Sequence, residues 1–412
     1  MNPFEQKTKA ADKLYLDWHK LYPKPYDKNE VDPYTRVRII LMNGTEYEAV
    51  WFSHQFHRHC GNNDLRRELA VLRRTEQQQQ KKIACLKPID ESMLETTIGY
   101  EQLAVDLTAI LARREPDPYV VQTMELALLE DFDHLYRYAD LLDFERGIHA
   151  ERLVGSYTEI MPGRPTISEH RHPRDSVRRA IDCELAAPIT KLNTAIITAA
   201  EQQTMNYYMN LAGFYDSDLG RRLYQEIGMI EEQHVTQYGA LMPTCCTWLE
   251  SLLMHEYTEC YLYYSCYEDE TDPQIKKLWE QHFEQEVSHL HAAADLLKKY
   301  EGKEWGEVIP GGAFPELLKF TPQKDYVRKV LKKTVYNTAA GEDPAMPVDT
   351  LSADAPFYQY QKMVCPNTEQ VASHEVIEQS IAANGTDYRF QEKEHPVEAL
   401  RDRAVDNTSV GR

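Results

Sequence analysis

The pattern of apolar and polar positions changes twice along the 412-residue chain. Between residues 92 and 300, apolar side chains recur every three or four residues, which predicts long amphipathic helices. Capping boxes and Pro-containing turns mark their ends, so that six helices are expected. They cover 92–115, 119–144, 182–214, 217–241, a stretch that begins at 247, and 272–300.

The segments on either side predict other structures. Residues 36–41 and 45–52 flank Asn43-Gly44, a dipeptide typical of a two-residue β-hairpin turn, and 64–82 has a helical pattern. Residues 301–412 are mostly loop-like, with short helical patterns near 324–335 and 369–383 and a disordered end from 402. The sequence therefore predicts a mainly α protein with an N-terminal α+β segment (1–90), a six-helix domain (91–300) and an irregular C-terminal extension (301–412).

A repeated pattern of acids and histidines lies on the predicted helices. An acid-x-x-His motif occurs on three of them, as Asp131–His134, Glu231–His234 and Glu286–His289. A glutamate precedes each motif by thirty residues, and these are Glu101, Glu201 and Glu256. Two further copies, ending at His172 and His395, fall in predicted loops and lack this glutamate. The sequence thus predicts three αα-hairpins of one design.

The spacing of these residues has a chemical meaning. Residues i and i+3 share one face of a helix, so the acid and the histidine of each motif can reach the same ligand. Charged groups on a buried face are costly unless they are paired or bind a cation. Two such hairpins would bring two glutamates and two acid-x-x-His motifs around a pair of metal ions. Carboxylate bridges with imidazole favour iron or manganese over zinc.

The sequence leaves open which hairpins form the site. The first and second hairpins can pair, as can the second and third, the first and third, or hairpins of different subunits. Glu201, Glu231 and His234 belong to both of the first two choices. The spare hairpin would then be a degenerate repeat or an interface.

These motifs resemble those of the ferritin-like superfamily, in its rubrerythrin and di-iron or di-manganese carboxylate branch, over about 210 residues. Tyr208 and Tyr263, each seven residues after a candidate glutamate, are similar to a tyrosine beside the ligands in that family. The resemblance implies a ferritin-like bundle with a di-iron centre, or a di-manganese centre as the alternative. It also implies an oxidase, oxygenase or peroxidase that reacts with O2 or peroxide and draws electrons from an unknown small-molecule substrate or donor. The other function class is a non-catalytic iron-binding or scaffold protein.

The composition of the chain limits which binding partners and which cellular compartment are expected. The formal net charge of −20 argues against binding to nucleic acid or to an anionic membrane. No run of about 18 apolar residues predicts a membrane span. Eight cysteines without a CxxC pair indicate reduced thiols in a cytoplasmic protein. For the group formed by His54, His57, His59 and Cys60, a polar loop is favoured over a zinc site. The long flanking segments favour a homodimer or larger assembly.

Overall fold

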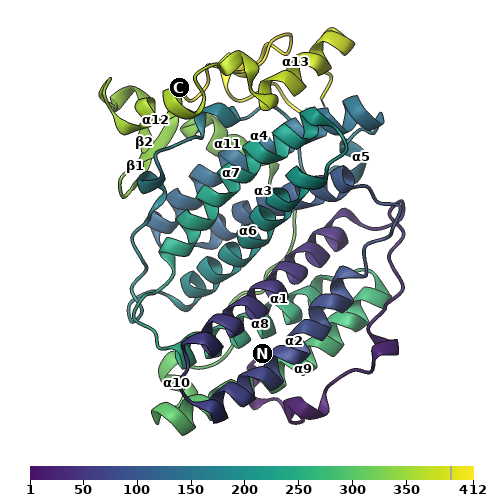
Figure 1. Ribbon diagram of the computed structural model, residues 1–412, viewed down its shortest axis with the longest axis vertical. Helices are drawn as coiled ribbons and strands as arrows, with labels where there is room; N and C mark the ends of the chain where they lie inside the picture. Colours follow the sequence, from purple (N-terminus) through teal and green to yellow (C-terminus); the bar gives the residue numbers. More distant parts are fainter. Residues whose placement is uncertain (390–391) are drawn as a thin grey trace. The chain divides into compact units, whose positions relative to one another are not determined.

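The computed structural model describes residues 1–389 and 392–412, and these are mainly helical (Figure 1). The chain divides into two compact units, each built from segments that are distant in sequence. The first unit comprises residues 1–91, 182–200 and 243–320, and the second comprises 92–181, 201–242 and 321–412. The six helices expected to form one domain over 91–300 are therefore shared between two units.

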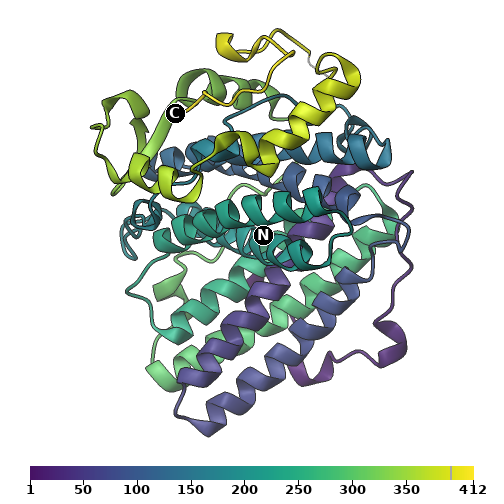
Figure 2. The same ribbon diagram turned by 45° about the horizontal axis from the view of Figure 1, so that its top comes forward.

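Four long helices make up most of the first unit: α1 (Pro33–His59), α2 (Asn63–Ala84), α8 (Trp248–Asp269) and α9 (Pro273–Glu301). In Figures 1 and 2 they run side by side. Helix α1 packs on α2 and on α8, and α9 packs on α8 and on α2, so two hairpins form a four-helix bundle. Each helix begins at a side-chain cap, supplied by Asp32, Asn62, Thr247 and Asp272. A short helix, α10 (Trp305–Val308), follows.

The predicted N-terminal β-hairpin is wrong, because residues 33–59 form one continuous helix, α1. Asp32 caps its start and Pro33 occupies its first turn, an arrangement that favours a helix. Asn43 and Gly44 lie inside this helix instead of in a turn. A glycine in a helix interior costs about 1 kcal/mol relative to alanine, which is small beside the burial of a helix face. Residues 34–42 are all buried, and toward the end of the helix the buried positions Thr45, Ala49, Ser53 and Phe56 recur at helical spacing.

The second unit is built around α3 (Met93–Arg114), α4 (Pro118–Arg146), α7 (Asp218–Leu241) and the part of α6 (Pro188–Phe214) from Glu201 onward. Helix α4 packs on α3 and on α7. A one-turn helix, α5 (Glu151–Val154), lies in the connection after α4. The C-terminal region adds α11 (Lys324–Thr334), α12 (Pro356–Val364) and α13 (Ala372–Asn384). Its strands β1 (Asn337–Ala340) and β2 (Asp343–Pro347) pair antiparallel.

The C-terminal end packs on its own unit, contrary to the predicted disordered end from residue 402. Helix α13 contacts α4 and α7. The Nη2 of Arg137 donates to Oδ1 of Asn407 (2.9 Å), and the hydroxyl of Ser168 donates to the carbonyl of Val410 (2.9 Å). Val410 is buried. The extension therefore completes the covering of α4 and α7.

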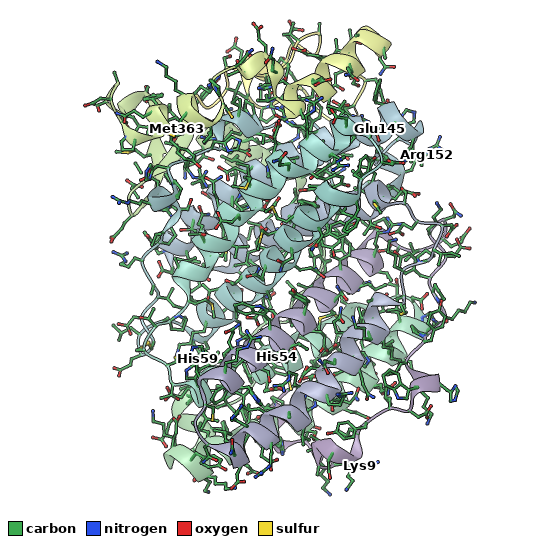
Figure 3. The ribbon with its side chains drawn as sticks, in the orientation of Figure 1. Lys9, His54, His59, Glu145, Arg152 and Met363 are labelled. Carbon is green, nitrogen blue, oxygen red and sulfur yellow. A yellow bond between two sulfur atoms is a disulfide. The ribbon has the colours of Figure 1, made fainter. Side chains whose placement is uncertain are left out.

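The structure also tests the sequence interpretations of the cysteines and of the histidine group on residues 54–60. Cys183 and Cys245, both in the first unit, form a disulfide with Cα atoms 6.3 Å apart, so the prediction of reduced thiols is wrong for this pair. Figure 3 labels His54 and His59 on α1, where the structure has a helix in place of the predicted polar loop. No described helix combines the length and the apolar character that a membrane crossing requires.

Candidate metal centres

The core of the second unit contains a cluster of acidic and histidine side chains that are at most 1% exposed: Glu101, Asp131, His134, Glu201, Glu231 and His234. Ligand atoms of Asp131, Glu201, Glu231 and His234 all lie within 4.8 Å of one another. The same holds for Glu101, His134 and Glu231. Glu231 belongs to both groups, so the cluster offers two adjacent positions that could hold metal ions and share one carboxylate.

The helices explain why these residues meet. Glu101 lies on α3 and Glu201 on α6, while α4 and α7 each present an acid and a histidine one turn apart on one face. All six residues come from the predicted first and second hairpins. Of the pairings that the sequence left open, the structure therefore has the first hairpin with the second.

Outer carboxylates orient both histidines. The Nε2 of His134 donates to Oε2 of Glu169 (3.0 Å), and the Nε2 of His234 donates to Oε2 of Glu130 (2.8 Å). Nδ1 of His134 lies 3.0 Å from Oε1 of Glu231, and Nδ1 of His234 lies 3.2 Å from Oδ1 of Asp131. A proton held on Nε2 leaves the Nδ1 lone pair for a cation, the arrangement that metal-binding histidines use in proteins.

Sequence reasoning missed Glu130 and Glu169. Glu130 lies beside Asp131 on α4 but about 100° further around the helix, so it points to a different neighbour. Its carboxylate also pairs with Arg171, which is fully buried. Glu169 lies in the connector between α4 and α6, at the start of an acid-x-x-His motif that the sequence places in a loop. This motif, Glu169-x-x-His172, was the sequence signal that could have identified Glu169.

The shifted pKa values and the unpaired oxygens of the buried carboxylates fit the binding of a cation in this cluster. Burial raises the pKa of Glu101 and of Glu201 well above the ordinary glutamate value, and the charge of Asp131 adds to the effect at Glu201. Burial also acts to raise the pKa of Glu231, but hydrogen bonds from the two histidines, when these are protonated at Nδ1 as well, hold it below the usual range; a bound cation would take the place of those two protons. Both oxygens of Glu201 and Oε2 of Glu101 accept no hydrogen bond within residues 1–389 and 392–412. Such orphaned buried oxygens fit a bound metal.

Tyr208 lies against this cluster, as the resemblance implies. Its hydroxyl donates to Oε1 of Glu101 at 2.6 Å. The tyrosine therefore reaches across the bundle to the glutamate of the opposite hairpin, although it follows Glu201 in sequence. The hydrogen bond fixes one oxygen of Glu101 and leaves the other free to face the cluster.

The first unit contains a second buried cluster on a related plan, made of Glu46, Glu76, Glu256, Glu259, Glu286 and His289, at most 4% exposed. Ligand atoms of Glu76, Glu256, Glu286 and His289 lie within 4.8 Å of one another, and so do those of Glu46, Glu76 and Glu259. The predicted third hairpin therefore supplies Glu256, Glu286 and His289 to a cluster of its own. It is neither spare nor paired with the first or second hairpin.

The partner of the third hairpin is α1 and α2, which sequence reasoning missed. Glu46 precedes Glu76 by thirty residues, the offset found in the other hairpins, but Gln79 stands where the acid-x-x-His motif has histidine. A search that allowed glutamine at this position would have found it. Tyr263 also repeats the role of Tyr208, because its hydroxyl donates to Oε1 of Glu46.

Comparisons with known proteins found no match to this chain among family models, curated proteins or solved structures. The site rests on its own geometry, which shows a mainly helical protein with buried carboxylate and histidine groups that could hold metal ions.

Proposed function

We propose that the second unit is the centre of a metal-dependent oxidoreductase of the ferritin-like class, which uses a pair of iron ions to react with O2 or peroxide. A manganese pair is the alternative. The observation that carries the proposal is the convergence of two glutamates and two acid-x-x-His motifs in the core of a four-helix bundle. Of the two clusters, this one has a histidine for each position and an outer carboxylate for each histidine.

The donor set fits two divalent cations. Four carboxylates, those of Glu101, Asp131, Glu201 and Glu231, would balance the charge of two such ions. The two histidines would add one imidazole to each position, which favours iron over magnesium or calcium. When bound, the metal pair would supply the electron transfer that O2 or peroxide requires.

The protein's own residues have three tasks in this proposal. Glu130 and Glu169 keep the proton of each histidine on Nε2, so that Nδ1 stays available. Tyr208 holds a proton at its hydroxyl, hydrogen-bonded to Glu101, next to the reacting pair. The burial of all six ligands excludes bulk water, which strengthens their electrostatic interactions. An electron donor or small-molecule substrate completes the reaction.

Metal content and turnover test this function together. Glu231→Ala removes the carboxylate shared by both positions, and Glu232→Gln changes its exposed neighbour on α7 as a control. Protein purified without added metal, and protein reconstituted with iron or manganese, would be assayed for both metals and for consumption of O2 and peroxide. The proposal is supported if Glu231→Ala loses turnover and about two metal equivalents per chain while Glu232→Gln loses neither. Absence of iron and manganese from the wild type overturns it, and bound metal without turnover favours the non-catalytic iron-binding role.

A further inference from the structure

The two clusters occupy corresponding places in two bundles, so they can be compared residue by residue. Glu46 and Glu101 are 55 residues apart, and so are Glu201 and Glu256. The same offset relates the remaining ligands, namely Glu76 to Asp131, Gln79 to His134, Glu231 to Glu286 and His234 to His289. Differences between the clusters are therefore substitutions within a shared arrangement.

Two substitutions change the donors in the first unit. Gln79 stands at the place of His134, and Glu259 stands at the place of Thr204. The first removes an imidazole and the second adds a carboxylate one turn after Glu256 on α8. The first-unit cluster consequently has five carboxylates and the single imidazole of His289, whereas the second-unit cluster has four carboxylates and two imidazoles.

The additional donors face the cluster and lack partners among the described residues. Both oxygens of Glu259 are buried and accept no hydrogen bond within the described chain, although they lie beside Glu46 and Glu76. Gln79 is fully buried, and its amide nitrogen donates to Oε1 of Glu286 while its Oε1 has no partner there. Unpaired buried oxygens of this kind are costly, and a cation would satisfy them.

A second layer fixes Glu46 toward the cluster. The hydroxyl of Tyr263 donates to Oε1 of Glu46, and Nδ1 of His282 lies 3.1 Å from the same hydroxyl. His282 corresponds to Ile227 in the second unit, so this support exists in the first unit alone. Oε2 of Glu46 accepts no hydrogen bond within residues 1–389 and 392–412 and remains available.

We propose that the first unit holds a second pair of cations, in which the position formed by Glu46, Glu76 and Glu259 is an all-oxygen site that takes a hard divalent ion such as Mn²⁺ and favours Fe²⁺ over Mn²⁺ less than the histidine-containing positions do. Carboxylate ligands without imidazole suit magnesium, calcium and manganese, whereas imidazole favours iron and zinc. Gln79 can turn its amide and add a carbonyl oxygen. The neighbouring position keeps His289, so the two positions differ in preference. This inference concerns metal binding alone and does not rest on the function proposed for the second unit.

Metal-binding stoichiometry tests this site in the whole chain. The background variant is Glu231→Ala, which disables the second-unit cluster, and metal is first removed by a chelator. Mn²⁺ is then added, and the unbound ion is followed by its electron paramagnetic resonance signal. We expect about two equivalents of Mn²⁺ to bind per chain in this background. Glu76→Ala added to it removes the carboxylate common to both positions and should abolish binding, whereas Glu284→Gln, a change of an exposed glutamate on α9, should leave it intact.

Exchange of residues between the corresponding places tests the all-oxygen position. Glu259→Thr, which installs the side chain of Thr204, should lose about one equivalent of Mn²⁺. Gln79→His, which installs the side chain of His134, should raise the bound iron-to-manganese ratio on the order of tenfold under anaerobic competition. Circular dichroism and thermal melting show whether each variant folds.

Two results would overturn the inference. One is a Glu231→Ala chain that folds but binds no Mn²⁺, and the other is a folded Glu259→Thr chain that binds as much as its parent. If Glu259→Thr fails to fold, Gln79→His still decides, since an unchanged metal ratio contradicts the all-oxygen site. Loss of O2 turnover in the second unit alters none of these stoichiometries, so the two proposals fail separately.

Discussion

Replacement of Glu130 by glutamine tests how the second-unit histidines are oriented. The Glu130 carboxylate accepts from Arg171 at Oε1 and from Nε2 of His234 at Oε2, the latter at 2.8 Å. Burial opposes its ionisation, but Arg171 and His234 lower its pKa to about 2. Glutamine has one acceptor oxygen and one NH2 group, so it cannot accept from both donors. Arginine stays protonated and would keep the oxygen, which leaves the NH2 group facing His234.

The consequence is a change of tautomer in the ring. Nε2 of His234 would accept from the amide, and its proton would move to Nδ1, the atom that faces Asp131 and Glu231. A protonated Nδ1 cannot bind a metal. Loss of an outer carboxylate of this kind typically lowers metal affinity about 10- to 100-fold, which corresponds to about 1.4–2.7 kcal/mol. The unbalanced charge of Arg171 should also destabilise the fold by about 3–5 kcal/mol.

A matched control separates the loss of metal affinity from the loss of fold stability. Asp133→Asn breaks another buried pair of α4, in which Nε of Arg137 lies 2.5 Å from Oδ2 of Asp133, without touching either histidine. Competition with a chelator at pH 7 measures metal affinity, and denaturant unfolding of the metal-free protein measures stability. Both variants should lose stability, and only Glu130→Gln should lose affinity. Equal affinities in the two variants would refute the proposed role of the outer carboxylate.

Three other outcomes are expected in the second unit. Burial raises the pKa of Asp140 to about 7, above its unfolded value of about 3.9, so its contribution to stability is full below pH 3.9 and lost as the pH rises through 7. Asp140→Asn should therefore flatten the pH dependence of the unfolding midpoint between about pH 4 and 7. Tyr208→Phe should keep the metal content but lower the free energy of unfolding by about 1.5–3 kcal/mol, because Glu101 loses a 2.6 Å hydrogen bond; denaturant titration checks this. On α7, Gly220→Ala should destabilise by about 1–3 kcal/mol because a Cβ would overlap a tyrosine ring, whereas Gly239→Ala, with open space, should stabilise by about 0.5–1 kcal/mol in the same assay.

The sequence predicts most of the long helices and much of both clusters. Capping boxes and Pro-containing turns place the starts of α3, α4, α8 and α9 close to where the structure has them. The thirty-residue offset names nine of the twelve cluster residues, because helical periodicity fixes which side chains share a face. Helix starts and shared helix faces depend on residues that are close together in the sequence, so a single sequence is enough to predict them.

What the sequence could not predict depends on tertiary contacts. The Asn43-Gly44 dipeptide favours a turn locally, but the burial of residues 34–42 and the packing of α1 on α2 and α8 outweigh that preference. The pairing of α1 and α2 with α8 and α9 requires a chain that leaves the first unit at Glu91 and returns to it at Asp182 and again at Pro243. No local signal specifies such a return. Glu130 was missed for the same reason, since its partner His234 lies on another helix.

The nested order of the hairpins strengthens the comparison between the two clusters. The offset of 55 residues holds between the two N-terminal hairpins and again between the two C-terminal hairpins, so both bundles present their ligands at the same helical positions. Thr75 corresponds to Glu130, and Nε2 of His289 has no hydrogen-bond partner in the described chain, whereas Nε2 of His234 has one. The first-unit histidine therefore lacks the outer carboxylate that raises ligand basicity. Since helical spacing is shared, any difference in metal preference must come from these side chains, and exchange of single residues between the units can transfer it.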